Sequence, residues 1–202
     1  SSQFVPSENT RKEDSAASTI GCDTVVMLQH EPVYTLGTGS DAQFVKSANG
    51  KVPTVRMDRG GEVTYHGPGQ LTVYPILDLR MYRQDIHWYM RALEEAVLLA
   101  LQMSGVTGAE RQDDTTGIWV DNHKVAAVGI KCRRWVTMHG VAINVEHKCL
   151  DDFAGIVPCG LEGRRVGCVN QFCDEPITVR DFAVHMKAAL EHVFRIKLVE
   201  RA

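Results

Sequence analysis

The chain has 202 residues, of which 44% are hydrophobic and 23% are charged. This is enough apolar material for the core of one globular domain. The formal net charge of −3 argues against general nucleic-acid binding, which needs a basic surplus. No apolar run approaches the roughly 20 residues of a membrane span, and no signal-peptide pattern opens the chain.

Six cysteines occur, at positions 22, 132, 149, 159, 168 and 173. A chain with a core of this size does not need disulfides, so we expect reduced thiols in a reducing compartment. Cys168 and Cys173 have no second matching pair, and the histidines show no HExxH spacing. We therefore expect no metal site.

The first part of the chain, residues 1–21, is polar and poor in large apolar groups. It predicts a mobile or poorly ordered arm ahead of a single domain over residues 22–202. Thr24–Gln29 is apolar and rich in β-branched residues, which predicts a buried strand. A loop is expected from His30 to about Lys51.

Two more strands are predicted over Val63–Tyr65 and Leu71–Leu77, on either side of a Gly67-Pro68-Gly69 turn. Asp85 is the predicted N-cap of a helix that Gly105 terminates. The apolar residues of this helix recur at three- and four-residue spacing: Ile86, Tyr89, Leu93, Val97 and Leu101.

Thr116–Val145 predicts an antiparallel meander, with a tight turn at Asp121-Asn122 and another reversal near Arg133-Arg134. Side chains alternate along a strand, so the odd separation of Lys124 and Lys131 places them on opposite faces unless a bulge intervenes.

A second helix is predicted from Thr178 to about Phe194. Thr178 and Asp181 resemble a capping box, and Phe182, Met186, Ala189 and Val193 form one apolar stripe. Strands and helices together predict an α/β (α+β) fold with mixed or antiparallel sheets flanked by helices.

Cys159 is set between Pro158 and Gly160. A free cysteine is ordinarily a small buried hydrophobe. Here, however, the proline stiffens the approach, and the glycine leaves the next peptide N–H open to stabilise an oxyanion. A thiol is a nucleophile only as thiolate, which a nearby ammonium favours. Lys124, just after a turn, is ordinarily a solvated charge. In one cleft with Cys159 it would support covalent acyl chemistry.

A glycine-rich segment, Arg59–Gln70, also contains an arginine and a histidine. Its glycines are compatible with simple turns, or with a backbone that lies close to an acyl chain or anion. It matches neither GxGxxG nor GxxxxGK[ST], so a nucleotide site is poorly supported. His66 and His139 are candidates for acid–base or orienting roles.

Small residues recur on the predicted strands, namely Ala126, Ala127, Gly129, Gly140 and Ala142. Close sheet packing explains them. So does an apolar slot wide enough for a straight alkyl chain.

Together these motifs resemble the octanoyltransferase family of lipoate biosynthesis, also called lipoyl(octanoyl) transferases. The matching blocks occur in the family's order and spacing: Gln29–Gly37, Arg59–Gln70, Thr116–Val120, Lys124–Ile130, His139–Asn144 and Ile156–Gly160. Two departures are the polar, weakly patterned residues 1–21, where the family has a helix, and His30-Glu31-Pro32 in place of the usual His-Pro-Pro.

The resemblance implies a catalytic fold shared with biotin and lipoate protein ligases. It implies that Cys159 is the acyl-thioester nucleophile and that Lys124 lowers its pKa. The implied acyl-substrate contacts are Arg59, Gly60, Gly61, Glu62, Val63, Thr64, Tyr65, His66, Ala127, Val128, Gly129, Gly140, Val141 and Ala142.

The resemblance further implies octanoyl-acyl carrier protein as donor, its acyl group held on phosphopantetheine, and no cofactor, with neither ATP nor metal. The implied acceptors are lipoyl domains of 2-oxoacid dehydrogenase complexes and the glycine cleavage H protein. The chain would act as a monomer in the cytoplasm of a bacterium or in a mitochondrion or plastid. Arg133, Arg134, Arg164 and Arg165 are candidates for a basic rim that meets acidic carriers.

Three alternatives stay open. An ATP-dependent lipoate or biotin protein ligase would share the fold but would need no nucleophilic cysteine. A noncatalytic acyl-carrier-binding protein would keep the slot, although the presence of both Lys124 and Cys159 counts against it. A cysteine hydrolase is the third alternative, and no Cys–His–Asn order supports it.

Overall fold

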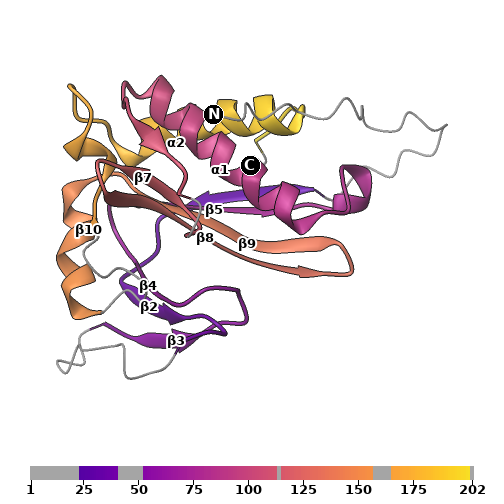
Figure 1. The fold of residues 1–202 in the computed structure, drawn as a ribbon, viewed down its shortest axis with the longest axis horizontal. Helices are drawn as coiled ribbons and strands as arrows, with labels where there is room; N and C mark the ends of the chain where they lie inside the picture. The colour runs from indigo at the N-terminus through magenta and orange to yellow at the C-terminus, as the bar shows by residue number, and fades with distance from the viewer. Residues whose placement is uncertain (1–22, 41–51, 113–114, 157–164, 201–202) are drawn as a thin grey trace.

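The computed structural model describes residues 23–40, 52–112, 115–156 and 165–200. They form two sheets and two long helices (Figure 1). The larger sheet has the strand order β1-β5-β9-β8-β7-β6, and β10 pairs with β8. Its strands are β1 (Thr24–Leu28), β5 (Gln70–Ile76), β6 (Ala109–Glu110), β7 (Ile118–Val120), β8 (His123–Arg133), β9 (Val136–Asn144) and β10 (Arg165–Val166).

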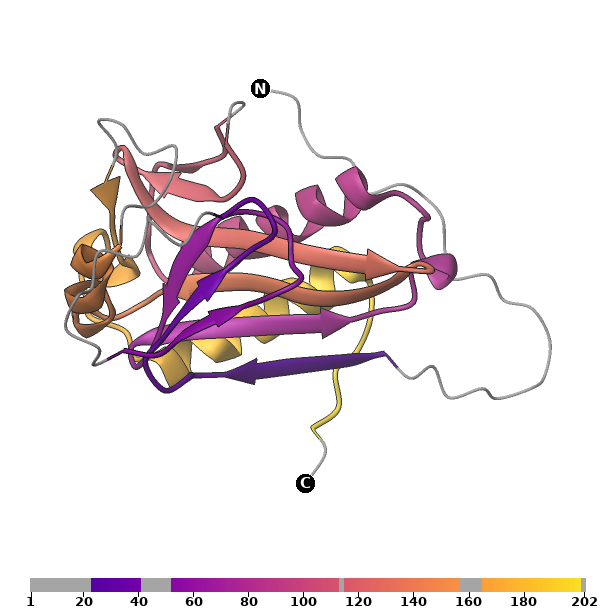
Figure 2. The same cartoon turned by 90° about the horizontal axis from the view of Figure 1, so that it is seen from below.

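The smaller sheet has the order β3-β2-β4. It consists of β2 (Val33–Leu36), β3 (Thr54–Arg56) and β4 (Val63–His66). It lies on one side of the larger sheet, and the helices α1 (Ile86–Met103) and α2 (Val179–Phe194) lie on the other (Figures 1 and 2). Three short 3-10 helices complete the description: η2 (Leu79–Met81), η3 (His147–Gly155) and η4 (Val169–Gln171).

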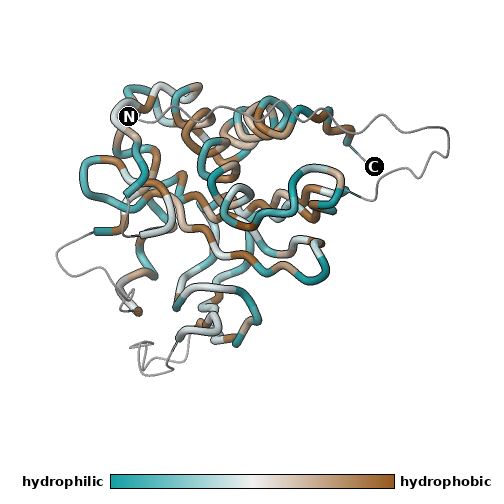
Figure 3. Tube along the Cα trace, turned by 45° about the vertical axis from the view of Figure 1, so that its right-hand side comes forward, coloured by the Kyte–Doolittle hydropathy of each residue, from teal (hydrophilic) through white to brown (hydrophobic). Residues whose placement is uncertain are grey.

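The helices were predicted correctly, since their apolar periodicity and caps act locally. Asp85 accepts a hydrogen bond from the Trp88 N–H at 3.0 Å, and Gly105 adopts a φ of 79° just beyond the helix. Thr178 caps α2 by accepting from the Asp181 N–H. Figure 3 shows the hydropathy alternating along the helices, as expected when one face is buried.

The core between the helices and the larger sheet contains Leu93, Val97 and Phe182, each fully buried. Ile86, which the periodicity placed on the same stripe, is 40% exposed and is the first residue of α1. No helix in the described part of the chain is long and apolar enough for a bilayer crossing.

The predicted meander is present as the antiparallel strands β7, β8 and β9. Its turns have positive φ angles at both central residues, 45° and 60° at Asp121 and Asn122, and 52° and 68° at Arg134 and Trp135. Such angles define the two-residue hairpin turns whose twist matches that of the strands.

A bulge lies at the start of β8. The pairing of β7 with β8 shifts register between Ile118 and Trp119, whose partners are Ala126 and Lys124. Val125 and Ala126 both enter the helix-side core, which breaks the alternation of side chains. Lys124 therefore shares a face with Ala127 and Gly129. The bulge is the exception for which the alternation rule allowed, so Lys124 and Lys131 do not lie on opposite faces.

Three strand assignments need correction. The expected loop from His30 contains β2, and β3 was not predicted, because each is only three or four residues long. β1 is a half-exposed edge strand rather than a buried one. β4 and β5 flank the Gly67-Pro68-Gly69 turn as expected, but they belong to different sheets, so this turn carries the chain between layers.

We expect Leu93→Ala to lower the free energy of unfolding by about 2–5 kcal/mol, because it opens a cavity in the fully buried face of α1. Denaturant titration followed by circular dichroism measures this. Leu98→Ala, on the same helix at a partly exposed position, should cost clearly less. Equal costs would show that the face of α1 buried in solution differs from this one.

Candidate active site

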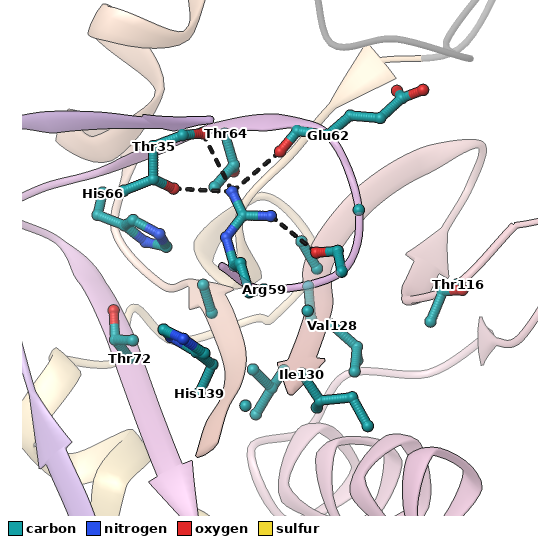
Figure 4. Close-up of a pocket in the computed structure, with 18 of the residues that line it drawn as sticks. Thr35, Arg59, Glu62, Thr64, His66, Thr72, Thr116, Val128, Ile130 and His139 are labelled. Carbon is teal, nitrogen blue, oxygen red and sulfur yellow. Dashed lines mark hydrogen bonds between the residues drawn. The ribbon is translucent and has the colours of Figure 1, made fainter. Parts of the chain in front are cut away.

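A cavity of about 540 Å³ lies between the two sheets, a size common for small-molecule sites. Its floor comes from β5, β8 and β9. Its roof comes from the Arg59–Gly61 loop and the smaller sheet (Figure 4). Of the contacts that the sequence predicted, those lining the cavity are Arg59, Gly60, Gly61, Glu62, Val63, Thr64, His66, Ala127, Val128, Gly129, Gly140, Val141 and Ala142.

Tyr65 is the exception among those predicted contacts. It is 1% exposed and packs beside Tyr34 and Phe153, away from the cavity. Its hydroxyl donates to Asp152 Oδ2 at 2.9 Å, and the Tyr34 hydroxyl donates to the Asp152 carbonyl at 2.8 Å. Tyr65 therefore fastens η3 to the smaller sheet rather than contacting a ligand in this cavity.

The small residues of the floor meet in register. Ala127 pairs with Ala142, and Gly129 pairs with Gly140. A Cβ at Gly140 would lie 2.2 Å from the Val73 carbonyl oxygen, so the approach of β9 to β5 requires glycine there. The floor is consequently flat and free of bulk, as an extended acyl chain requires.

Arg59 is a buried cation in the roof, 8% exposed. It donates to the carbonyl and hydroxyl oxygens of Thr35 at 3.0 and 2.8 Å, to the Glu62 carbonyl at 2.9 Å and to the Gly60 carbonyl at 3.0 Å (Figure 4). These acceptors are all uncharged, so they orient the guanidinium without neutralising it. Burial lowers the Arg59 pKa from its usual value.

A chain of amides fixes the tautomer of His66. Asn144 Nδ2 donates to the Gly167 carbonyl at 2.9 Å, so Asn144 Oδ1 accepts from Gln70 Nε2 at 2.9 Å. Gln70 Nε2 also donates to the Tyr65 carbonyl, so Gln70 Oε1 must accept from His66 Nδ1 at 2.7 Å. The other ring nitrogen, Nε2, is then an acceptor.

Burial lowers the pKa of His66 to about 4. The ring is therefore neutral at pH 7, and His66 serves there as a hydrogen-bond acceptor rather than a proton donor. Near it on the floor, the Thr72 hydroxyl is buried without a hydrogen-bond partner among the described residues. Both groups are available to polar atoms of a ligand (Figure 4).

Other ring side chains extend this polar wall. His30 Nε2 and the Tyr74 hydroxyl are 2.7 Å apart, and the His30 ring lies 5.5 Å from that of His66. His139 adopts a φ of 60° and places Nε2 3.4 Å from Asp58 Oδ1. Sequence reasoning gave His30 no role, although it lies in one of the motif blocks.

Lys124 lines the cavity next to the small-residue floor, with Nζ 5.4 Å from the centre of the Trp119 ring. β10 runs parallel to β8 and places Val166 opposite Lys124, and the Gly167 N–H donates to the Lys124 carbonyl at 3.1 Å. Lys131 is not part of the cavity lining and instead forms an ion pair with Asp58.

Cys159 and its neighbours, residues 157–164, lie outside the described residues. The described chain on either side approaches the cavity. Ile156 packs in the cluster of the smaller sheet, and Arg165 begins β10.

The other described thiols, Cys132, Cys149, Cys168 and Cys173, are unpaired. Burial raises the pKa of Cys149 to about 12 and that of Cys168 to about 11, so neither forms thiolate at neutral pH. Cys149 is fully buried. Within the described residues no His, Cys, Asp and Glu groups gather as a metal site, and the absence of a metal stays a prediction.

Residues 6–191 match the model of the lipoyl protein ligase A/B catalytic domain. A bipartite lipoate protein ligase of Thermoplasma acidophilum superposes with a TM-score of 0.71 at 18% identity, over 88% of this chain and 73% of that one. The chain therefore belongs to the lipoyl protein ligase A/B catalytic-domain family, and the predicted fold is confirmed.

Two curated relatives show which type of enzyme within this family the chain resembles. The octanoyltransferase of Gloeobacter violaceus is 50% identical over 175 residues, which cover 87% of this chain and 77% of the relative. The chloroplastic octanoyltransferase of Arabidopsis thaliana is 46% identical over 155 residues, which cover 76% of this chain and 55% of the relative. Within the family this chain is an octanoyltransferase, as its motifs predicted, and thus an acyltransferase.

We expect the free energy of unfolding to fall as the pH drops from about 6.5 to about 4. Over this range the unfolded chain protonates His66, whereas burial keeps the ring neutral in the folded chain. Stability therefore rises with pH across this interval. Denaturant titrations at several pH values should show a smaller slope for His66→Gln and an unchanged slope for His87→Gln, an exposed control. Equal slopes for wild type and His66→Gln would contradict the neutral assignment.

Proposed function

We propose that the Cys159 thiolate attacks the octanoyl thioester carried by the phosphopantetheine of an acyl carrier protein. The new carbon–sulfur bond forms as the carrier thiolate leaves, and that thiolate takes a proton. The acyl group then passes to the lysine amine of a lipoyl domain, which releases Cys159 and forms an amide. Exchange between two thioesters is nearly balanced, and the amide drives the second step.

The observation that carries this proposal is the position of Lys124. Its side chain lies at the edge of a flat floor of alanine and glycine, inside a cavity of suitable size. An ammonium there favours a neighbouring thiolate and can accept a proton from the incoming amine once it has given up its own. Two opposite charges about 4 Å apart attract by a few kcal/mol at intermediate dielectric.

The acyl chain is proposed to lie along the floor, beneath the Arg59–Gly61 loop. The tetrahedral oxyanion would receive backbone N–H groups near Gly160 and Gly140. His66 has an orienting role as acceptor, in keeping with its pKa of about 4. His139, beside Asp58, is the remaining candidate for an acid–base or orienting role. No ATP or metal takes part.

The proposed donor is octanoyl-acyl carrier protein. The proposed acceptors are the lipoyl domains of 2-oxoacid dehydrogenase complexes and the glycine cleavage H protein. One relative is chloroplastic and others are cyanobacterial, which supports a plastid or a bacterial cytoplasm. We propose that residues 22–202 act as one catalytic unit and as a monomer, since both sheets contribute to one cavity.

An ATP-dependent ligase is the second candidate, because a lipoate-protein ligase A bound with ATP has the same fold, with a TM-score of 0.69 at 19% identity. Such a ligase activates a free acid and needs no cysteine nucleophile. Octanoate with ATP, tested against octanoyl carrier protein without ATP, separates the two. Transfer only in the first mixture would reject our proposal.

Incubation with octanoyl carrier protein should add one octanoyl group to the intact protein, in a hydroxylamine-labile thioester. Cys159→Ser should lose this labile adduct, and Cys132→Ser, at a half-buried thiol, should keep it. Intact-mass spectrometry measures both. The same labile adduct on Cys159→Ser would disprove the nucleophile assignment.

Lys124→Ala should raise the pKa of the Cys159 thiol by about one unit or more, as expected when a nearby cation is lost. The rate of alkylation at Cys159 against pH reports this pKa. Lys131→Ala is the control, because Lys131 pairs with Asp58 outside the cavity lining. A profile that Lys124→Ala leaves unchanged removes the role assigned to Lys124.

Charge-reversal variants should show which of the candidate rim arginines affects the KM for an acidic carrier. Arg165 on β10 lies opposite His123 on β8, next to Lys124. Arg133 lies ten residues after His123 on β8, about 30 Å from it along the strand. Arg165→Glu should raise the KM for an acidic carrier at low salt and lose this effect at high salt. Arg133→Glu should leave KM unchanged. No salt-dependent change at Arg165 would make it an ordinary surface residue.

A further inference from the structure

A buried carboxylate on α1 contacts the segment just before β7 and has no role assigned so far. The Glu94 side chain is 2% exposed. One oxygen, Oε2, lies 2.9 Å from Arg91 Nη1 and 3.4 Å from Arg111 Nε. The other, Oε1, accepts a buried hydrogen bond of 3.1 Å from the Gly117 N–H. Two arginines compensate the charge, and the remaining oxygen is committed to one backbone amide.

Gly117 fits tightly against Lys124. Its φ is 122°, and a Cβ there would lie 2.4 Å from the Ala126 carbonyl oxygen and 2.7 Å from Lys124 Cε. The peptide at Gly117 thus forms a wall along the lysine stem. Thr115 and Thr116, which precede it, line the cavity.

Two residues therefore flank the Lys124 side chain. Gly117 contacts Cε on one side, and the ring of the fully buried Trp119 lies 5.4 Å from Nζ. Both residues flank Ile118, which is paired with β8 across the bulge. A charged acceptor makes a stronger hydrogen bond to a backbone N–H than a neutral one does. Glu94 also stands on a helix whose neighbouring positions, Leu93 and Val97, are fully buried.

We propose that Glu94 and Gly117 are positioning residues for Lys124: α1 holds the Gly117 peptide through the Glu94 carboxylate, and that peptide holds the lysine stem so that its ammonium faces the cavity. The inference rests on the proposed role of Lys124 in octanoyl transfer. Neither residue touches the acyl group. They affect the reaction only by setting the position of the Lys124 amine.

The first test compares two glycines. Gly117→Ala forces a methyl group onto Lys124 Cε and the Ala126 carbonyl oxygen, whereas the methyl group of Gly108→Ala, also at a positive φ of 73°, meets nothing within 4 Å. Both variants place alanine at a positive φ, so the readout has to be specific to the Lys124 amine. Limited labelling with an amine reagent, followed by peptide mass spectrometry, should show Lys124 at least threefold more reactive in Gly117→Ala, with Lys131 unchanged as an internal reference.

The second test changes the carboxylate. Glu94→Gln places an amide N–H₂ against either Gly117 or the arginines, all of which are donors, so one contact must break. Glu191→Gln on α2 is the matched control, because the Glu191 carboxylate likewise accepts from a cation, Lys187, and from a backbone N–H, that of Leu198. Glu94→Gln should raise Lys124 labelling and lower the rate of Cys159 alkylation at pH 7 by about three- to tenfold. Glu191→Gln should change neither.

The outcomes separate this inference from the proposed function. Increased Lys124 labelling in Gly117→Ala and Glu94→Gln, with a raised thiol pKa, supports both. Increased labelling while wild type shows no Lys124-dependent thiol pKa keeps the positioning role and rejects the Cys–Lys pairing. Labelling of Lys124 that matches the two controls overturns the positioning role. If Gly117→Ala fails to fold, Glu94→Gln alone decides in the same way.

Discussion

One extra residue in β8 decides which way Lys124 points. Without the bulge at Val125, strict alternation from Ala127 would turn Lys124 toward the helices, into a core that has no room for an ammonium. With the bulge, Val125 and Ala126 both fill that core and the lysine reaches the space between the sheets. The short β7 strand and the Gly117 peptide are arranged around this irregularity, so the site depends on it.

The cavity wall contains a buried cation, Arg59, and a neutral histidine, His66. Arg59 is held by uncharged oxygens only, and His66 is kept neutral by burial. A buried cation near a neutral acceptor gives a positive local potential. Such a potential favours the anionic species of acyl transfer, the thiolate and the tetrahedral oxyanion. The amide chain from His66 through Gln70 and Asn144 ends at Gly167, directly beside the lysine backbone.

Local signals made the two helices and the β7–β9 meander predictable from sequence. Asp85 and Thr178 act as caps within one turn, and Asp121-Asn122 adopts the angles of a hairpin turn by itself. Most of the roof and floor residues were also predictable, because they occur in motif blocks. The strands β2 and β3 were not, since three or four residues show no period, and their pairing is set by distant partners.

The remaining misses follow from tertiary geometry. Tyr65 lies between two residues that line the cavity, but its ring packs against Tyr34 and Phe153, partners that are distant in the sequence. Sequence reasoning assigned no role to Glu94, because its burial depends on the packing of the Gly117 loop on α1. The bulge could be allowed for in advance but not located, since it arises from register between strands.

The chain on either side of the Cys159 segment is anchored to different layers. Asp152 and Ile156 are tied to the smaller sheet by Tyr34 and Tyr65, while Arg165 and Val166 add a strand to the larger one. Phe153 and Val166, beside these two anchors, both line the cavity. A substitution that weakens either anchor therefore alters the cavity wall itself, so mutations that seem purely structural at Tyr34 or on β10 would also change catalysis.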